Sequence, residues 1–132
     1  MVSKEVWTMK LNEECSYPPY VLGRIFRVLE SIQQAAYPDT RLTIKDRFFD
    51  KACQTPAATF SMLLKMKNEN IRKLNWDKKG LAFNYEKRLT ELMGKLGETF
   101  PVRLNREEQF TFALGYYHER QRQFAKKKEK ET

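Results

Sequence analysis

The stretch that most constrains the fold runs from Asn105 to Lys128 and reads NREEQFTFALGYYHERQRQFAKKK. Asn105 suits an N-cap, and Glu108 three residues later completes a variant of the capping box. Acids near the start and lysines near the end match the helix dipole. Apolar residues recur at helical spacing and predict an inward face made of Phe110, Ala113, Leu114, Tyr117 and Phe124. The stretch therefore predicts one long amphipathic helix.

Four more helices are predicted upstream, over residues 20–36, 44–52, 56–74 and 81–97. Pro18 and Pro19 suit the start of the first helix, and Thr43 with Asp46 can cap the second. Thr55 followed by Pro56 predicts the start of the third by a capping hydroxyl. A polar turn is expected over residues 75–80, and Gly97 is expected to end the fourth helix. These signals divide most of the chain into helices with short connections.

The fold class that follows is all-α, a single-domain bundle of about five helices. Strands are poorly supported because valine is scarce and no Asn-Gly or Asp-Gly hairpin turn occurs. Residues 18–125 form the predicted bundle. Residues 1–17 form an N-terminal arm or linker, apolar enough over residues 6–11 to dock or to pair as a short strand. Residues 126–132 form a charged tail that is expected to fray.

The charge balance favours an anionic partner. The chain has 25 Lys and Arg against 17 Asp and Glu, which gives a net charge of +8. Nucleic acid, an acidic protein face or a membrane surface would suit such a surplus, although a basic surface can also be merely solvated. No long apolar run predicts a membrane helix, and the N-terminus lacks the apolar centre of a signal peptide. We therefore expect a cytoplasmic protein that does not associate with membranes.

Catalytic, metal and cofactor motifs are not found in the sequence. One histidine, His118, cannot form a multi-histidine metal site, and no nucleophile motif stands beside it. Cys15 and Cys53 lack metal-ligand spacing and are expected to be reduced thiols. No glycine-rich nucleotide loop occurs. We expect no enzyme, no cofactor and no metal, with His118 on a partly exposed helix face.

Basic residues at helical spacing are the more informative pattern, because phosphate binding needs cations spread over a surface. The candidate stripes, one on each of three helices, are Arg24, Arg27, Ser31 and Gln34; Lys65, Asn68 and Arg72; and Arg120, Arg122 and Lys126. Lys45 and Arg47 are expected to be solvated on the second helix. Any single stripe is equally typical of a solvated face, but three in one bundle favour a shared groove. Gly115 within a helix indicates close backbone packing.

Three segments carry a resemblance to a known family. They are LGRIFRVLESIQQAA, TIKDRFFDKACQTPAATF and EEQFTFALGYYHERQRQF, in this order. Together they resemble the C-terminal region of the large subunit of the type I-C CRISPR interference complex, Cascade. The resemblance covers about residues 20–124. In that family the region also exists as a separate polypeptide made from an internal start, the Cascade small subunit, and a chain of this length resembles that product.

The resemblance implies a non-catalytic part of an RNA-guided complex, while cleavage belongs to a separate helicase-nuclease. Its implied partners are the large subunit, the backbone subunits that hold the crRNA, further copies of itself, and target DNA. A basic surface would contact the non-target strand or the heteroduplex and stabilise the R-loop. Arg24, Lys45, Arg47 and Arg120 lie in the matching segments. The alternative is a structural spacer whose basic face meets acidic subunits without touching nucleic acid.

Overall fold

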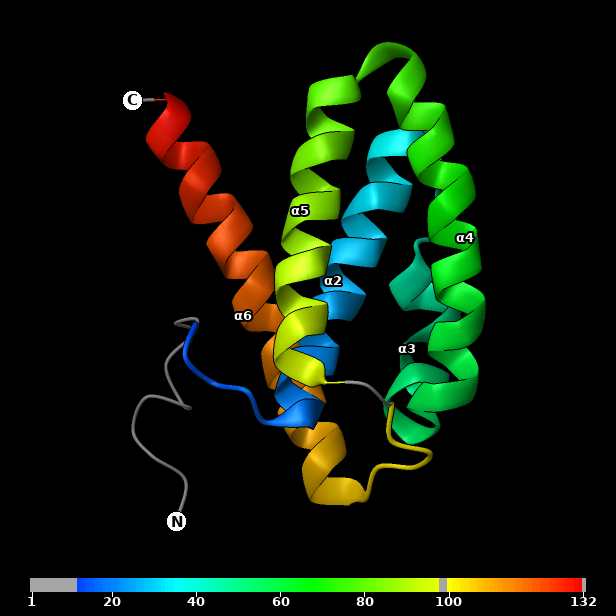
Figure 1. The fold of residues 1–132 in the computed structure, drawn as a ribbon, viewed down its shortest axis with the longest axis vertical. Coiled ribbons are helices and arrows are strands. Elements are labelled where there is room, and N and C mark those ends of the chain that lie inside the picture. Colours follow the sequence, from blue (N-terminus) through cyan, green and yellow to red (C-terminus); the bar gives the residue numbers. More distant parts are fainter. Residues whose placement is uncertain (1–11, 98–99, 132) are drawn as a thin grey trace.

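The computed structural model describes residues 12–97 and 100–131, which form a helical bundle without strands within those ranges. The helices are α2 (Pro18–Ala36), α3 (Ile44–Gln54), α4 (Pro56–Asp77), α5 (Lys79–Leu96) and α6 (Arg106–Glu131), as Figure 1 shows. The prediction of an all-α bundle is confirmed. The apolar segment over residues 6–11 lies outside the described residues.

Two predicted capping boxes are present. Thr43 N–H donates to Asp46 Oδ2 at 2.9 Å, and Asp46 N–H donates back to Thr43 Oγ1 at 3.3 Å. Asn105 and Glu108 exchange the equivalent pair of hydrogen bonds at 2.8 Å each. Each box satisfies backbone donors that the first helical turn leaves without partners. The starts of α3 and α6 are thus local properties of the chain.

The predicted start of α4 at Pro56 is confirmed, but the expected Thr55 cap and the expected turn between α4 and α5 differ from the structure. The Thr55 hydroxyl does not cap α4, because it donates to the Lys51 carbonyl at 3.1 Å and so belongs to the end of α3. The expected turn over residues 75–80 shrinks to Lys78, because α4 continues to Asp77 and α5 begins at Lys79. Polar residues alone do not break a helix. Helix α6 extends past Lys126 to Glu131, into the predicted charged tail.

Helix α2 is the centre of the bundle. It is buried continuously from Pro19 to Gln33, and α4, α5 and α6 surround it (Figure 1). The Phe26 ring lies 5.6 Å from the Phe49 ring and 5.8 Å from the Phe112 ring, measured between centroids. Phe60 and Tyr116 complete this aromatic cluster in edge or tilted contacts. The cluster ties α2, α3, α4 and α6 to one core.

The buried face of α6 differs from the predicted one. Phe110 and Phe124 are about half exposed, at 48% and 45%. The residues that α6 buries instead are Phe112, Gly115, Tyr116, His118 and Glu119. This face carries a glycine and a carboxylate, so apolar periodicity alone pointed to the neighbouring face. The way this face packs against α2 determines which side of α6 is buried.

Candidate nucleic-acid interface

Two glycines bring α2 and α6 into direct backbone contact. A Cβ atom on Gly23 would lie 1.9 Å from the Phe112 carbonyl oxygen. A Cβ atom on Gly115 would lie 2.1 Å from the Tyr20 carbonyl oxygen. No side chain larger than hydrogen fits at either position while the helices keep this separation. The prediction of close backbone packing at Gly115 is confirmed.

Beside this contact lies a partly buried ion-pair cluster made of Arg24, Arg88, Arg122, Glu13 and Glu119, here called the arginine–glutamate cluster. The side chains of Arg24 and Glu119 are fully buried, whereas that of Glu13 is 46% exposed. The fully buried Arg24 donates from Nε to Glu119 at 3.1 Å and from Nη2 to Glu13 at 3.0 Å. Arg88 donates to both Glu119 oxygens at 2.9 Å. Arg122 lies 3.4 Å from Glu119 and 3.5 Å from Glu13. The cluster joins α2, α5, α6 and the segment before α2.

Glu13 and Arg88 of the cluster are held in their charged forms by charged neighbours. Burial by itself raises the pKa of Glu13, but hydrogen bonds and attraction from Arg88 and Arg24 outweigh it and lower that pKa from 4.5 to about 2. Burial likewise opposes the charge on Arg88, yet its hydrogen bonds to Glu119 and Glu13 raise its pKa. The pKa of Arg122 is lowered by burial and by repulsion from Arg88. Glu119 is therefore the central counter-ion of the cluster.

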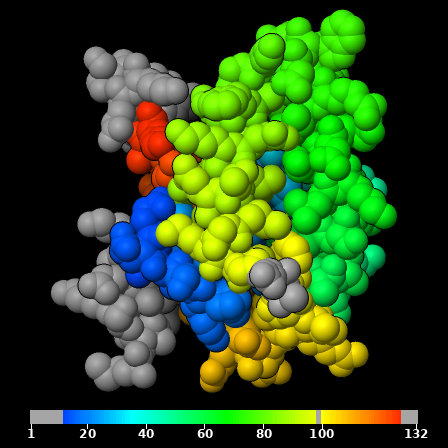
Figure 2. All heavy atoms as spheres, viewed as in Figure 1, coloured from blue at the N-terminus to red at the C-terminus, as the bar shows by residue number. Residues whose placement is uncertain are grey.

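Glu13 also anchors the chain segment that precedes α2. Its backbone carbonyl accepts a hydrogen bond from Lys95 Nζ at 2.8 Å, and Asn12 N–H donates to the Tyr20 hydroxyl at 3.0 Å. Figure 2 shows this segment, in dark blue, lying against α5. The described part of the predicted arm therefore packs on the bundle.

A second buried polar group lies one turn further along α2. Arg27 donates to Glu30 at 2.6 Å and to Gln123 at 2.8 Å. The Tyr116 hydroxyl also donates to Glu30, and burial together with that carboxylate raises the pKa of Tyr116. Ser31 donates to the Arg27 carbonyl at 3.0 Å. These contacts satisfy polar groups that would otherwise be costly to bury.

The prediction that Arg24 and Arg27 lie on an exposed cationic stripe was wrong. Their relative exposures are 0% and 8%, and each guanidinium forms an ion pair with a carboxylate inside the bundle. Helical spacing identifies residues that share a face but does not say whether that face meets solvent or another helix. The carboxylates that neutralise the two arginines come partly from α6, far away in sequence.

His118 was predicted to be partly exposed, and this was also wrong. Its relative exposure is 2%, and its Nδ1 shares a hydrogen bond of 2.6 Å with the Tyr20 hydroxyl. The two rings meet edge to face, with centroids 5.4 Å apart. His118 thus packs in the α2–α6 contact. Within the described residues, no group of three or more His, Cys, Asp or Glu side chains could hold a metal ion.

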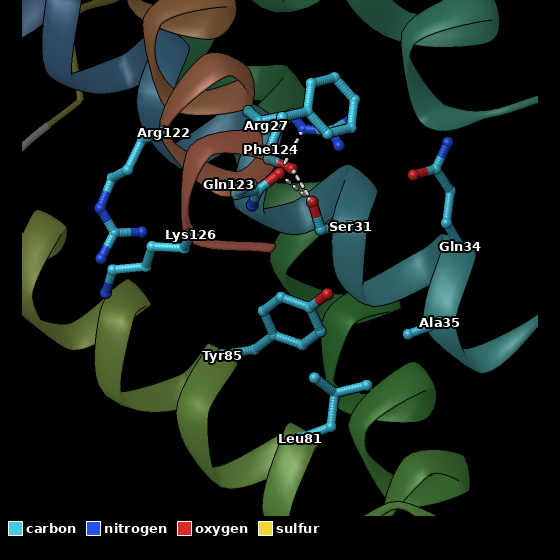
Figure 3. A pocket seen from close by; sticks show the side chains of 10 residues that line it. All are labelled: Arg27, Ser31, Gln34, Ala35, Leu81, Tyr85, Arg122, Gln123, Phe124 and Lys126. Carbon is cyan, nitrogen blue, oxygen red and sulfur yellow. Dashed lines mark hydrogen bonds between the residues drawn. The ribbon is translucent and has the colours of Figure 1, made fainter. Parts of the chain in front are cut away.

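A groove of about 500 Å³ opens between α2, α5 and α6 (Figure 3). We call it the α2–α5–α6 groove, and its lining residues are Arg27, Ser31, Gln34, Ala35, Leu81, Tyr85, Arg122, Gln123, Phe124 and Lys126. A neighbouring hollow of about 380 Å³ shares Tyr85, Arg122 and Lys126 with it and adds Lys87. Figure 3 shows Arg122 and Lys126 side by side on one rim and Gln34 across from them.

Two of the three predicted stripes meet at this groove. Arg27, Ser31 and Gln34 come from α2, and Arg122 and Lys126 come from α6. The α4 stripe, with Lys65 and Arg72, is exposed but does not line the groove. Residues of the α2 and α6 stripes therefore line one groove together, whereas those of the α4 stripe do not.

The remaining predicted cations lie elsewhere on the surface. Arg120 is exposed, and its guanidinium lies 5.2 Å from the centre of the Phe124 ring at the groove. Arg47 is exposed on α3. Lys45 is only half-exposed, with its ammonium 5.4 Å from the Phe49 ring centre, so the expectation that it would be solvated holds in part. Of these three, Arg120 lies nearest the groove lining.

Helix α5 supplies site residues that the sequence reasoning missed. Tyr85 forms part of the groove floor, and Lys87 lines the adjoining hollow. Neither residue was among the predicted site residues. Asn84, Lys87 and Glu91 do recur at spacings of three and four, which is the signal that could have found this face.

No helix in the described ranges combines the length and the hydropathy needed to cross a bilayer. No curated protein matches the chain. A family model described as CRISPR-associated protein (Cas_Csd1) matches residues 1–124, which is nearly the whole chain. That match agrees with the resemblance carried by the segments on α2, α3 and α6. The chain therefore belongs to the CRISPR-associated protein (Cas_Csd1) family.

Proposed function

We propose that this chain is a non-catalytic small subunit of a type I-C Cascade complex and stabilises the R-loop by sequence-independent binding of DNA. The observation that carries the proposal is the α2–α5–α6 groove with its basic rim, in a protein of a CRISPR-associated family. Its partners would be the large subunit, the backbone subunits around the crRNA, further copies of itself and target DNA. Its place of action would be the cytoplasm.

Ion pairing inside the bundle supports a basic outer surface. The inner arginines Arg24, Arg27 and Arg88 are each matched by carboxylates, mainly Glu13, Glu30 and Glu119. The chain still carries a surplus of +8, from 25 basic and 17 acidic residues. Among the described residues the buried charges cancel, because Arg24 and Arg27 are matched by Glu30 and Glu119, so the basic surplus of the described part of the chain lies at partly or fully exposed positions. Such a surface attracts phosphates and releases counter-ions on binding.

We assign the cations to three groups from their burial and their position at the groove. Arg122, Lys126 and Lys87 line the groove and its extension, so we assign them the main phosphate contacts. Outer contacts are assigned to Lys45, Arg47, Lys65, Arg72 and Arg120. The buried Arg24 and Arg27 instead position α6 against α2. No catalytic role is proposed for any residue.

A spacer function is the second candidate, and exposed aromatic residues favour it. Trp76 near the end of α4 is 85% exposed, and Phe83 on α5 is 68% exposed. Large exposed rings of this kind are typical of protein–protein contacts. In this alternative the basic surface meets acidic subunits and touches no nucleic acid.

The first experiment compares two double variants in a reconstituted complex. Lys87→Ala with Lys126→Ala removes two charges at the groove, and Lys65→Ala with Arg72→Ala removes two on α4. We expect the groove variant to weaken R-loop formation and to lower the slope of log K against log[salt] by about 1.5, from two lost phosphate contacts. The α4 variant should have a smaller effect. R-loop formation that is unchanged in the groove variant would refute the groove as the DNA site.

A second experiment separates DNA binding from a spacer role. The assembled complex is bound to target DNA whose non-target strand carries photoreactive bases, and adducts to this chain are measured after irradiation. DNA binding predicts an adduct that the groove variant loses. A spacer predicts no adduct, with R-loop yield insensitive to the groove substitutions.

A further inference from the structure

The α2–α5–α6 groove combines ring faces with cations, which a surface that only binds phosphates does not need. Phe124 from α6 and Tyr85 from α5 line it together with the apolar Leu81. Arg122 and Lys126 stand on one rim, within the same cavity (Figure 3). Phe124 is 45% exposed, so a large part of its side chain is open to a ligand. The groove therefore offers a stacking surface beside an anion site.

The size of the groove favours a single nucleotide over a duplex. Pockets of about 300–1,000 Å³ typically hold small ligands, and this groove has about 500 Å³. In a heteroduplex the bases stay stacked inside the helix, so a protein meets backbone and groove edges only. Bases of a single strand can leave the stack and lie on aromatic rings.

We infer that the α2–α5–α6 groove takes an unstacked base of single-stranded DNA on Phe124, with the adjoining phosphates on Arg122 and Lys126. This inference rests on the proposed function, and it selects the displaced single strand over the heteroduplex as the ligand. Arg120 extends the site, because its guanidinium lies 5.2 Å from the centre of the Phe124 ring. Arginine planes can themselves contribute to binding of stacked bases.

Recognition at this site is by ring contact and charge, so it tolerates any base. Gln123 is held by Arg27 and Ser31 at 2.8 Å and 3.1 Å through its side-chain oxygen. Gln34 lies across the groove from the cationic rim (Figure 3). Because the Gln123 oxygen is already engaged, that amide is not free to form the bidentate pattern that reads adenine. Binding should therefore depend on the presence of a base more than on its identity.

The test uses the purified full chain and two oligonucleotides of equal length, an oligothymidylate and an abasic strand with the same number of phosphates. Wild-type protein should bind the base-bearing strand about fivefold or more tightly, from one stacked base. Phe124→Leu, which keeps an apolar side chain but removes the ring, should abolish that preference and leave affinity for the abasic strand unchanged. Phe83→Leu, an exposed phenylalanine of α5 that does not line the groove, is the matched control.

Two further measurements sharpen the outcome. Lys126→Ala should weaken binding of both oligonucleotides and reduce the salt slope, whereas Phe124→Leu should leave the salt slope unchanged. Photocrosslinking with 5-iodouracil should place the adduct on the peptide that contains Phe124. Equal affinity for base-bearing and abasic strands, duplex bound as tightly as single strand, or an adduct on Trp76 in place of Phe124 would each overturn the inference.

The inference and the proposed function can fail separately. If R-loop formation falls in the Lys87→Ala, Lys126→Ala complex but the abasic strand binds as well as the base-bearing one, DNA binding stands and the stacking site is refuted. If Phe124→Leu removes the base preference but the complex forms R-loops normally without the groove lysines, the stacking site stands and the R-loop role is refuted.

Discussion

Helices α2 and α4 each carry a stripe of cationic and polar residues spaced three and four apart, and the bundle treats the two stripes in opposite ways. On α2, Arg24 is fully buried and bound by Glu119 at 3.1 Å. On α4, Arg72 pairs with Glu69, one turn away, and both side chains are mostly exposed, at 71% and 65%. The same local pattern thus gives an interior ion pair in one helix and a solvated surface pair in the other.

The difference lies in what each helix meets. Helix α2 faces α6, which supplies Glu119 at the point where Gly23 and Gly115 bring the backbones together. Burying an arginine is costly unless a carboxylate with good geometry compensates it. Helix α4 lies at the edge of the bundle, so its cationic face meets water. A periodic basic stripe therefore identifies residues that share a helix face, but it does not determine whether that face is exposed to solvent.

The largest predicted effect on stability comes from removing Glu119, the carboxylate that binds the buried arginine of α2. Glu119→Ala would leave Arg24 and Arg88 partly unpaired, and breaking a buried pair costs about 3–5 kcal/mol of unfolding free energy. Chemical denaturation monitored by circular dichroism measures it. The matched change on the exposed side, Glu69→Ala, should cost less than about 0.5 kcal/mol. Equal losses of unfolding free energy in the two variants would contradict the difference between the buried and the exposed ion pair.

Glycine substitutions should sharpen the comparison next. Gly23→Ala places a methyl 1.9 Å from the Phe112 carbonyl oxygen, so α2 and α6 must separate, at a cost of about 1–3 kcal/mol or more. Gly94→Ala in α5 meets nothing within 4 Å and should stabilise the protein by up to about 1 kcal/mol through helix propensity. The two thermal midpoints should therefore move in opposite directions. A stabilising Gly23→Ala would refute the close contact.

The smallest predicted effect concerns pH and Glu13. Because the folded protein lowers the pKa of Glu13 from 4.5 to about 2, this group stabilises the fold fully above pH 4.5 and loses that contribution as pH falls toward 2. The carboxylate is partly exposed, so we discount the effect to about 1–2 kcal/mol. Urea unfolding of wild type and Glu13→Gln should differ at pH 6 and converge near pH 2. A constant difference across this range would contradict the assignment.

Much of the secondary structure could be predicted from local residues. Both capping boxes, at Thr43 and at Asn105, were predicted and are present, because they depend on groups three residues apart. Gly97 ends α5 at the predicted position, with a positive φ of 93° that favours glycine. The boundary between α4 and α5 was not predictable in this way, because the residues around Lys78 are polar but compatible with helix.

The candidate site was predicted less completely. Arg122 and Lys126 were assigned to a shared groove and do line it, whereas Tyr85 and Lys87 were not assigned to it. A groove is formed by side chains from several helices, so its membership depends on how the helices are rotated. Lys65 and Arg72 are exposed as predicted, but they lie outside the groove. Exposure alone therefore does not identify the residues that line it.

Local sequence was sufficient for the existence and type of the helices, and its segments were sufficient to point to a CRISPR-associated family. It could not give the rotation of α6, whose buried face holds Gly115, Tyr116 and Glu119 while Phe110 and Phe124 remain half exposed. Helix formation depends on hydrogen bonds and side chains within a few residues of one another. Burial depends on non-local fit, here the closeness of two glycines and the pairing of Arg24 with a carboxylate 95 residues away.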